Sequence, residues 1–538
     1  MPHELPQEFL DRMKNDLGDQ MEAFLASYER PLRPSLRVNR LKISSEAFRK
    51  AYGERFHLTP VTWEEAGFYY DEETRPGRSA LHEAGVFYIQ EASAMIVGTV
   101  SGVRPGEKVL DLCAAPGGKS THLAMKMQGQ GILVSNEIMP ARARILSRNI
   151  ERMGVTNAVV TNEAPADLAD HFPAFFDRII VDAPCSGEGM FRKEEAAIPN
   201  WSPQNVALCA GRQREILEAA DRMLKPGGTL VYSTCTFARP EDEENVAWFM
   251  SEHSNYEEED LPALLGDRLD QWRLSPGFDG RSLRVWPHKA CGEGHFCARL
   301  RKSGGTLDLN SAGGKNAASS LHGQTFAAKN PESQTSVLSL KDLAAELDRE
   351  SNSSAASRKK NRGGNFKKKR KGSSKGGSDR ETQDLLNSFW TETFSAEFPE
   401  DLSSRLLTFG DDIFLAPFEH DAIDLSGLRV LRPGLHLGTM KKGRFEPAHA
   451  LALAVLQTES KKDSGPFPTV FHVKNTVSLT ADSPETLSYL RGESLACDQN
   501  LKGWTLVLAD GFPLGWGKAS SGTLKNHYPK GLRIQGGY

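Results

Sequence analysis

The sequence predicts an α/β protein whose centre is a doubly wound parallel sheet. Between residues 107 and 235, short apolar runs alternate with longer amphipathic stretches, as in parallel strands joined by helices. A second observation is the stretch 109–121, where an apolar run leads into a Pro/Gly/Gly turn and then a helical pattern. Glycine lets the backbone approach a ligand where a Cβ atom would clash. We therefore expect a ligand-binding loop at the carboxyl edge of this sheet, although an ordinary tight turn is the alternative.

The elements of this central region follow from the spacing of its apolar residues. Strands are expected at 108–113, 131–136, 157–161, 177–182 and 228–234. Helices are expected near 119–128, 140–153, 166–171 and 203–224, and Lys-Pro-Gly-Gly at 225–228 ends the last one. Two further strands, 282–286 and 295–301, are expected to form an antiparallel edge. Together these elements predict one domain over residues 85–301.

The N-terminal region, residues 1–84, is expected to be an RNA-binding extension. It starts with amphipathic helices up to about residue 30 and continues as a small α/β segment. Between the two lies the stretch 30–40, which holds Arg30, Arg33, Arg37 and Arg40 together with two prolines. Such a stretch either follows a phosphate backbone or is a solvated surface segment.

The composition changes again after residue 301. Residues 302–382 are rich in Ser, Gly, Asn and Lys, and we expect a disordered basic linker with a short helix at 338–347. Its basic run at 358–371 either attracts RNA or is a soluble spacer. Residues 383–538 are expected to form a mixed β domain. Aromatic and basic residues near its end suit an RNA surface, although Trp516 could equally fill a core.

The overall composition narrows the class of protein. The chain has 538 residues, of which 39% are hydrophobic and 25% charged, with a net charge of −4. Its seven cysteines are scattered, which favours a reducing compartment and a cytoplasmic location over a disulfide framework. The N-terminus has no signal-peptide pattern, and no apolar run approaches the roughly 20 residues that span a bilayer. A membrane is therefore not expected as a partner. No metal-type Cys-x-x-Cys pair occurs, so a metal ion is not expected either.

Two cysteines follow strands of the predicted sheet. Strand 177–182 leads into Asp-Ala-Pro-Cys-Ser-Gly, which contains Asp182 and Cys185, and strand 228–234 leads into Ser-Thr-Cys-Thr, which contains Cys235. A single buried cysteine is usually an inert small hydrophobe. Two at the carboxyl ends of neighbouring parallel strands should meet beside the glycine loop, which favours a chemical role.

An acidic residue indicates what the loop binds. Glu137 follows the strand 131–136, at the position where dinucleotide-binding folds hold a ribose diol. The loop itself is not the Gly-x-Gly-x-x-Gly that cradles a pyrophosphate. It therefore better fits a nucleoside without a pyrophosphate, such as S-adenosylmethionine.

Three motifs together resemble one known family. Cys-Ala-Ala-Pro-Gly-Gly-Lys at 113–119, Asp-Ala-Pro-Cys-Ser-Gly at 182–187 and Ser-Thr-Cys-Thr at 233–236 are similar, in order and spacing, to the Nop/Sun (RsmB/RsmF-type) family of RNA cytosine-5 methyltransferases. The resemblance covers about residues 85–301. The stretch 182–193 and the C-terminal β domain look like the RsmF-like branch, which methylates small-subunit (16S) ribosomal RNA near the decoding site. The resemblance implies a class I, Rossmann-like S-adenosylmethionine-dependent methyltransferase fold with an N-terminal α/β extension and a C-terminal PUA-like domain.

The resemblance also implies where the cofactor binds. The family places S-adenosylmethionine on the 113–119 loop, on an acidic residue after the second strand, on a residue after the third strand and on the first motif residue after the fourth. In this chain these are Cys113, Ala114, Ala115, Pro116, Gly117, Gly118, Lys119, Glu137, Asn162 and Asp182. The third-strand position departs from the family, which often has Asp-Gly-Arg there. Asn162 is our expected adenine contact, with Glu163 as the second choice.

The same resemblance assigns the chemistry. Cys235 is implied to be the nucleophile that adds to C6 of cytosine, and Cys185 is implied to assist breakdown of the adduct. Asp182 is expected to hydrogen-bond the N3/N4 edge of the base, and Lys119 to order the loop or the substrate edge. We expect a monomeric enzyme that methylates C5 of cytosine in small-subunit ribosomal RNA. Alternatives are a tRNA cytosine-5 methyltransferase and a non-catalytic RNA-binding ribosome-assembly factor. Ser-Thr-Cys-Thr and the basic regions disfavour a small-molecule or DNA methyltransferase.

Overall fold

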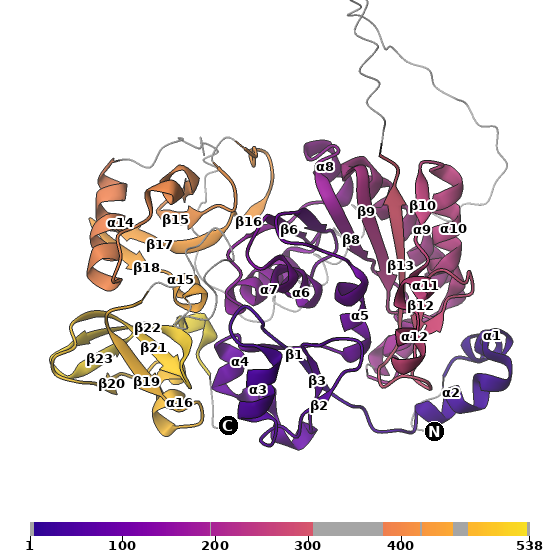
Figure 1. Ribbon diagram of the computed structural model, residues 1–538, viewed down its shortest axis with the longest axis horizontal. Helices are drawn as coiled ribbons and strands as arrows, with labels where there is room; N and C mark the ends of the chain where they lie inside the picture. The colour runs from indigo at the N-terminus through magenta and orange to yellow at the C-terminus, as the bar shows by residue number, and fades with distance from the viewer. Residues whose placement is uncertain (1–4, 194, 305–379, 420–421, 456–471, 535–538) are drawn as a thin grey trace, which may run out of the picture.

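The computed structural model describes residues 5–193, 195–304, 380–419, 422–455 and 472–534 (Figure 1). The helix expected at 338–347 and the basic run at 358–371 lie outside these residues. None of the helices in the described ranges is both long enough and apolar enough to cross a bilayer.

The central domain is built on one large sheet with the strand order β11-β12-β13-β9-β8-β5-β6-β7-β16. The five strands predicted to be parallel are confirmed as β5 (Lys108–Asp111), β6 (Ile132–Asn136), β7 (Ala158–Thr161), β8 (Phe176–Asp182) and β9 (Leu224–Thr234). Strand β9 begins earlier than expected because Leu224 already pairs with Phe176 of β8. The chain runs outward through β6 and β7 and then returns to β8. The loop after β5 therefore lies at a topological switch point, where ligands bind in such sheets.

The expected antiparallel edge is also confirmed. It comprises β10 (Tyr256–Glu258), β11 (Ser275–Pro276), β12 (Leu283–Val285) and β13 (His295–Lys302). Strand β13 pairs with β9 along its length, so that Phe296 lies opposite Thr234.

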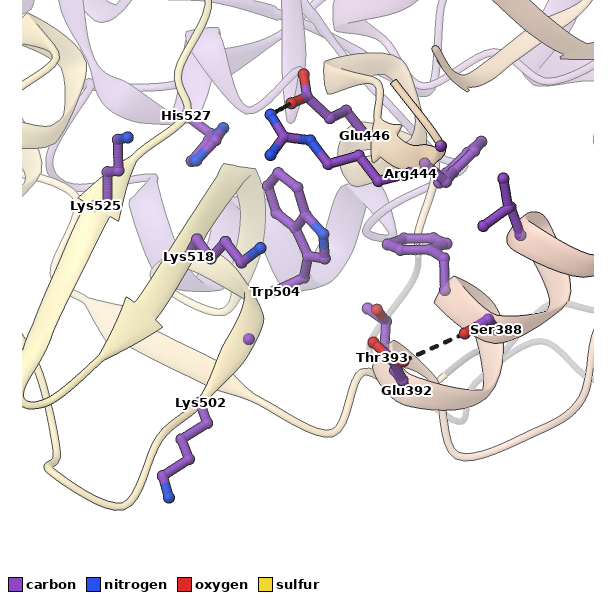
Figure 2. A pocket seen from close by; sticks show the side chains of 15 residues that line it. Ser388, Glu392, Thr393, Arg444, Glu446, Lys502, Trp504, Lys518, Lys525 and His527 are labelled. Atoms are coloured by element: carbon purple, nitrogen blue, oxygen red, sulfur yellow. Dashed lines mark hydrogen bonds and ion pairs between the residues drawn. The ribbon is translucent and has the colours of Figure 1, made fainter. Parts of the chain in front are cut away.

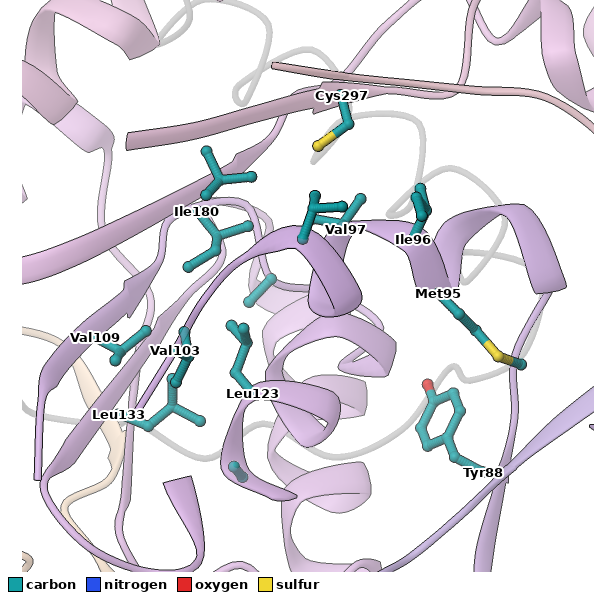
Figure 3. Close-up of a cluster of buried hydrophobic side chains, with 14 of the residues drawn as sticks. Tyr88, Met95, Ile96, Val97, Val103, Val109, Leu123, Leu133, Ile180 and Cys297 are labelled. Carbon is teal, nitrogen blue, oxygen red and sulfur yellow. The ribbon is translucent and has the colours of Figure 1, made fainter. Parts of the chain in front are cut away.

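Helices cover both faces of the sheet. One face carries α5 (Ala92–Val100), α6 (Gly118–Met127) and α7 (Pro140–Arg152), and the other carries α8 (Pro165–His171), α9 (Pro203–Met223) and α10 (Glu243–Glu252). Alternate strand residues enter the two cores: Val109 and Leu133 belong to the first (Figure 3), and Leu110 and Val134 to the second. Short helices α11 (Leu261–Leu265) and α12 (Arg268–Gln271) follow β10. Helix α10 was not expected from the sequence.

The N-terminal region has two parts. The expected amphipathic helices are α1 (Gln7–Leu17) and α2 (Met21–Ser27), whose buried Phe9 and Phe24 pack against Phe191 and Phe237 of the central domain. A small antiparallel sheet follows, with the order β2-β3-β1-β4. Its elements are β1 (Ser35–Val38), β2 (Thr59–Pro60), β3 (Gly67–Tyr69), β4 (Phe87–Ile89), α3 (Ser45–Tyr52) and α4 (Ala80–Glu83).

The arginine stretch 30–40 is not a continuous RNA-facing surface. Arg37 lies in β1, is 0% exposed, and donates hydrogen bonds to the Gly118 carbonyl and to Thr121 Oγ1, each at 2.7 Å. Arg37 is therefore neither the RNA contact nor the solvated surface residue that the sequence allowed, because β1 lies inside its sheet and directs this side chain onto α6. Arg33 lies over the ring of Tyr69, with its guanidinium carbon 4.5 Å from the ring centroid.

The C-terminal half contains two sheets (Figure 1). The first has β14 (Leu406–Phe409), β15 (Asp412–Leu415), β17 (Leu435–Lys441) and β18 (Arg444–Pro447), with α14 (Arg380–Thr393) and α15 (His449–Ala454). The second has β19 (Thr476–Leu479), β20 (Leu495–Ala496), β21 (Gly503–Ala509), β22 (Phe512–Ser520) and β23 (Thr523–Asn526), with α16 (Pro484–Arg491). Trp516 is only 2% exposed and donates to the Ala448 carbonyl at 3.0 Å, so it fills the core and is not an RNA contact.

One strand of this half joins the central domain instead. β16 (Val430–Arg432) pairs antiparallel with β7 and becomes the last strand of the large sheet. This segment, which the sequence pattern places in the C-terminal β domain, therefore completes the central sheet. Strand β7 would otherwise leave its edge unpaired, and β16 satisfies those backbone groups.

The N-terminal sheet and the second C-terminal sheet share a hydrophobic core. The buried side chains of Phe48 and Phe87 belong to the same cluster as Tyr489 and Leu514. Polar contacts at its margin include the Tyr52 hydroxyl and Asp510, 3.2 Å apart. The two regions are thus expected to lose their packing together.

This shared core generates a stability prediction. Phe48 is 0% exposed, so Phe48→Ala should lower the free energy of unfolding by about 3–5 kcal/mol through lost burial and a residual cavity. Denaturant unfolding of the full chain measures the change. Leu32→Ala, at a residue 41% exposed, should change it by less than about 0.5 kcal/mol. Equal small effects for both variants would contradict the shared core.

Candidate active site

Two thiols meet at the carboxyl edge of the central sheet. Cys185 and Cys235 lie in the loops after β8 and β9, and their Sγ atoms are 3.3 Å apart. The loops are joined directly, because Gly189 N donates to the Cys235 carbonyl at 2.9 Å. All seven cysteines of the chain are free. The sequence-based expectation that these two thiols share one site is confirmed.

Asp182, the last residue of β8, lies at the centre of a polar cluster. Its Oδ2 accepts a hydrogen bond from Lys119 Nζ at 2.6 Å, and its Oδ1 accepts one from Ser233 Oγ at 3.0 Å. His295 Nε2, on β13 on the far side of β9, is 3.6 Å from Oδ1. Lys119 also interacts electrostatically with Cys235, so this cluster and the thiols form one site. Ser233 opens the quoted Ser-Thr-Cys-Thr motif but had no role assigned to it, and His295 was not singled out in the sequence.

The side chains of this cluster stabilise one another in their charged forms. Burial alone would favour the neutral acid, but Lys119 and His295 lower the pKa of Asp182 well below its usual range. Burial opposes the charge of Lys119 in the same way, and the Asp182 carboxylate raises its pKa nevertheless. The hydrogen bond to Cys235, together with burial, raises the pKa of Cys185 well above that of a free thiol. These pKa shifts favour an anionic Asp182 and a Cys185 that keeps its proton.

The glycine loop between β5 and α6 is held mainly through its carbonyl groups. Arg142 Nη2 donates to the Ala115 carbonyl at 2.9 Å, and Asn149 Nδ2 donates to the Pro116 carbonyl at 2.8 Å. Gly117 has φ of +111°, a conformation that side-chain-bearing residues rarely adopt. The loop predicted from the sequence is thus a rigid turn braced by α7 and, through Arg37, by the N-terminal sheet.

Glu137 and Asn162 lie beside this loop, after β6 and β7. Glu137 is 3% exposed, and its Oε1 accepts from Met139 N at 2.9 Å. The Asn162 amide donates to the carbonyls of Glu137 at 2.7 Å and Ile138 at 2.8 Å, which fixes the backbone that carries Glu137. Glu163 pairs with Arg429 next to β16, Oε2 to Nη2 at 3.1 Å. An adenine contact by Asn162 stays a prediction.

Three acidic side chains lie around the loop. Burial raises the pKa of the Cys113 thiol well above its ordinary value, and Glu137, Asp111 and Asp182 raise it further. Burial also raises the pKa of Asp111 itself to about 7. Asp111 is 0% exposed; its Oδ2 accepts from Ser120 Oγ at 2.6 Å, whereas its Oδ1 has no partner among the described residues. A buried acceptor and the carboxylates of Glu137 and Asp182 fit a cationic nucleoside such as S-adenosylmethionine. Within the described residues, no group of three or more His, Cys, Asp or Glu is placed to hold a metal ion.

The N-terminal helices support the Cys185 loop through Glu188. This carboxylate is 0% exposed, and it accepts hydrogen bonds from Arg12 at 2.5 Å, Trp201 Nε1 at 2.8 Å and Phe237 N at 3.2 Å. Glu188 thereby ties α1 to both cysteine loops. It was part of a quoted motif, but its partner Arg12 is 176 residues away and could not be found from local sequence.

Glu241 is a second buried carboxylate behind the thiols. It is 0% exposed, and its Oε1 accepts from Ser186 N at 2.9 Å and from Gln213 Nε2 at 3.0 Å. Gln213 Nε2 also donates to the Pro184 carbonyl at 3.1 Å, so both neighbours of Cys185 are held. Sequence reasoning missed Glu241. Its only signal was an acidic run, Pro-Glu-Asp-Glu-Glu, soon after Cys235.

Titration of Glu241 should make the free energy of unfolding depend on pH. Burial raises its pKa from 4.5 to about 7, so the native state binds this proton more tightly than the unfolded chain. The corresponding stability is fully present below about pH 4.5 and is lost as the pH rises through about 7. Glu241→Gln does not titrate. The unfolding free energy of the wild type, relative to this variant, should therefore fall between about pH 5 and pH 8 in denaturant titrations.

The exposed Gln204→Ala alters no titratable group and provides the control, because its difference from the wild type should not change over that pH range. A wild-type advantage over Glu241→Gln that grows with pH would contradict the assignment.

The chain matches four described families along most of its length. Residues 99–301 match the family described as 16S rRNA methyltransferase RsmB/F. Residues 5–92 match the N-terminal domain of 16S rRNA methyltransferase RsmF, 389–455 match the RsmF rRNA methyltransferase first C-terminal domain, and 476–534 match the methyltransferase RsmF PUA domain.

Curated relatives agree with these matches. Ribosomal RNA small subunit methyltransferase F of Pectobacterium carotovorum is 39% identical over 58% of this chain and 66% of its own length. The proteins of the same name from Vibrio vulnificus and Cronobacter sakazakii are 41% and 42% identical, over 58% and 56% of this chain and 67% and 63% of their own. The chain thus spans about two thirds of the length of the curated relatives it matches.

The chain is also similar to parts of solved structures. A methyltransferase homologue from Pyrococcus horikoshii is 28% identical, with a TM-score of 0.46, over 55% of this chain and 100% of that one. The structure named NSun6 from Pyrococcus horikoshii with SFG is 22% identical, with a TM-score of 0.49, over 55% and 98%. From the family matches and the curated relatives, this chain belongs to the RsmB/F family of 16S rRNA methyltransferases and carries the N-terminal, first C-terminal and PUA domains of the RsmF type.

Proposed function

We propose that this protein methylates C5 of a cytosine in small-subunit ribosomal RNA, through a covalent bond between Cys235 and C6 of the base. The observation that carries the proposal is the pair of sulfur atoms 3.3 Å apart beside the Asp182–Lys119 ion pair and the glycine loop. The chemistry needs such a pair, because C5 of cytosine is too weak a nucleophile to take a methyl group unaided.

Cys235 supplies the covalent step. Its thiolate forms a bond to C6, and the electron pair of the C5–C6 double bond moves to make C5 nucleophilic. S-adenosylmethionine, when bound at the 113–119 loop, supplies an electrophilic methyl group on its sulfonium sulfur. Glu137 and Asp182 would hold this cation by charge, and the buried Asp111 Oδ1, on a group whose pKa burial raises to about 7, offers an unused acceptor.

Cys185 serves the release of the product. Once C5 carries the new methyl group, the C5 proton passes to water, the C5–C6 double bond re-forms, and the C6–S bond breaks with its electron pair on sulfur. The Cys235 sulfur leaves as a thiolate and is stabilised by accepting a hydrogen bond. Cys185 Sγ is within hydrogen-bond distance, and the raised pKa of Cys185 supports its presence as a thiol that can donate one.

Asp182 and Lys119 bind and polarise the base. The depressed pKa of Asp182 keeps an anionic acceptor at the site, suited to the protonated N3 and the N4 amino group of the covalent adduct. Lys119 orients that carboxylate through its 2.6 Å hydrogen bond. The target base must leave its stack to reach the thiols, at a cost of a few kcal/mol that RNA contacts elsewhere on the protein would offset.

The substrate class rests on the family and its domains. The matched relatives are named for small-subunit ribosomal RNA, and this chain carries the accessory domains of that branch. An enzyme acting on ribosomal RNA would work in the cytoplasm with the ribosome or its precursors. We retain a monomer as the expected state.

Substitution of the two cysteines separates their roles. Cys235→Ala should lower methyl transfer from labelled cofactor to ribosomal RNA by several orders of magnitude, because no adduct can form. Cys185→Ala should instead accumulate a covalent protein–RNA complex that survives a denaturing gel, since release is impaired.

Cys497→Ala removes a thiol of the C-terminal half and should leave both measurements unchanged. Normal turnover of Cys235→Ala would overturn the nucleophile assignment. A stable complex in Cys235→Ala but none in Cys185→Ala would exchange the two roles.

The RNA class is tested by mapping 5-methylcytosine. Bisulfite sequencing of ribosomal and transfer RNA, from cells with and without this gene, should show one or more small-subunit positions that lose methylation. Loss at transfer RNA positions alone would overturn the ribosomal substrate.

A further inference from the structure

The C-terminal half contains a pocket that the proposed chemistry does not use. It lies between helix α14, strand β18 and strands β21 to β23, and its volume is about 630 Å³ (Figure 2). That volume is within the roughly 300–1,000 Å³ of typical ligand pockets. Its lining joins the first and second C-terminal sheets, which match two different family domains.

Trp504 forms a rigid aromatic surface in this pocket. Its ring is half-buried, and Figure 2 shows it at the centre of the lining. The ring of His527 lies edge-on to it with centroids 4.6 Å apart, and the core residue Trp516 lies 6.5 Å away on another side. These contacts fix the orientation of the indole. A ligand that stacks on it would therefore lose little additional conformational freedom of the protein.

Positive charge surrounds the aromatic surface. Lys502, Lys518 and Lys525 line the pocket and are exposed, and within the described residues none has a carboxylate at salt-bridge distance. Lys518 Nζ is 5.5 Å from the centroid of the Trp504 ring. Arg444 also lines the pocket but is paired with Glu446 at 2.8 Å. The unpaired ammonium groups make this rim a site for anions.

The acidic residues of the lining limit what can bind. Glu392 lies on the α14 wall, where Ser388 donates to it at 3.2 Å, and Glu446 lies on the β18 wall. An anionic group placed between them would be repelled, whereas a neutral aromatic ring would not. A ligand that fits both parts has an uncharged planar ring for Trp504 and an anionic group for the lysines. An unpaired nucleotide has this form, and an acidic peptide does not.

We propose that this pocket binds an unpaired nucleotide of single-stranded RNA, with the base stacked on Trp504 and adjacent phosphates on Lys518 and Lys525. The proposal rests on the proposed function only for the choice of RNA as the nucleic acid. The pocket belongs to the C-terminal half and is separate from the thiol site, so it would bind RNA outside the target cytosine. Binding there would add to the affinity of the protein for its RNA substrate.

Binding of a short oligonucleotide tests the pocket without catalysis. The probe is a fluorescent single-stranded oligoribonucleotide of about eight adenosines and uridines, which offers no cytosine to the active site. Its dissociation constant from the full chain is measured by anisotropy over a series of salt concentrations. Trp504→Leu should raise that constant about ten- to hundred-fold by removing the stacking surface, and Trp504→Phe should restore most of the affinity.

The lysines have a separate signature in the salt dependence. The double variant Lys518→Ala/Lys525→Ala should weaken binding and reduce the slope of log affinity against log salt by about 1.4, which is about 0.7 for each phosphate contact. Arg491→Ala/Lys530→Ala is the matched control, because it removes the same charge from exposed positions of the same half outside the pocket. This control should leave affinity and slope close to the wild type.

Three results would overturn the proposal. The first is wild-type affinity in Trp504→Leu. The second is an equal loss in the control double variant, which would indicate diffuse charge attraction only. The third is a polyglutamate peptide that competes with the oligonucleotide as well as RNA does, which would indicate a protein partner.

Methyl transfer to ribosomal RNA separates this proposal from the proposed function. The pocket variants should raise KM and leave kcat unchanged. If the wild type methylates no RNA but oligonucleotide binding still depends on Trp504, the pocket is supported and the proposed function fails. If the wild type methylates RNA with an unchanged KM in every pocket variant, the pocket proposal fails alone.

Discussion

The parallel pairing of β8 and β9 sets the position of both thiols. Asp182 and Ser233 are register partners at the ends of these strands, and Cys185 and Cys235 follow within a few residues. Neighbouring parallel strands end at one edge, so short loops suffice to bring the two sulfur atoms to 3.3 Å. The glycine loop after the adjacent β5 ends at the same edge. Lys119, on the first turn of α6, thereby reaches Asp182.

Buried charged side chains fix the positions of these loops through hydrogen bonds. Glu188 joins both cysteine loops to Arg12 of the N-terminal helices, and Glu241 holds the backbone around Cys185. Arg37 performs a similar task for the glycine loop from the N-terminal sheet. The N-terminal region is therefore structurally part of the active site. At the other end of the sheet, β16 of the C-terminal half pairs with β7, next to Asn162.

Much of this arrangement could be predicted from sequence, for a physical reason. Parallel strands covered by helices on both faces are continuous apolar runs, and the turn after Asp111 carries its own glycine signal. Glu241 and Arg37 were missed or misjudged because a charged residue is normally exposed, and only distant partners make its burial tolerable. Strand β16 escaped prediction because local pattern does not say which sheet a short strand joins. The role of Trp516 was ambiguous for a different reason: RNA-stacking surfaces and hydrophobic cores use the same aromatic side chains.

The central claim is that one sulfur atom, that of Cys235, bonds to the base. Its most direct test uses RNA in which the target cytosine carries fluorine at C5, because the release step cannot remove fluorine as it removes a proton. Incubation with S-adenosylmethionine, digestion and mass spectrometry then locate the modified peptide. We expect methylated fluorocytosine attached to Cys235. Attachment to Cys185, or no attachment in a preparation that methylates ordinary RNA, would contradict the account.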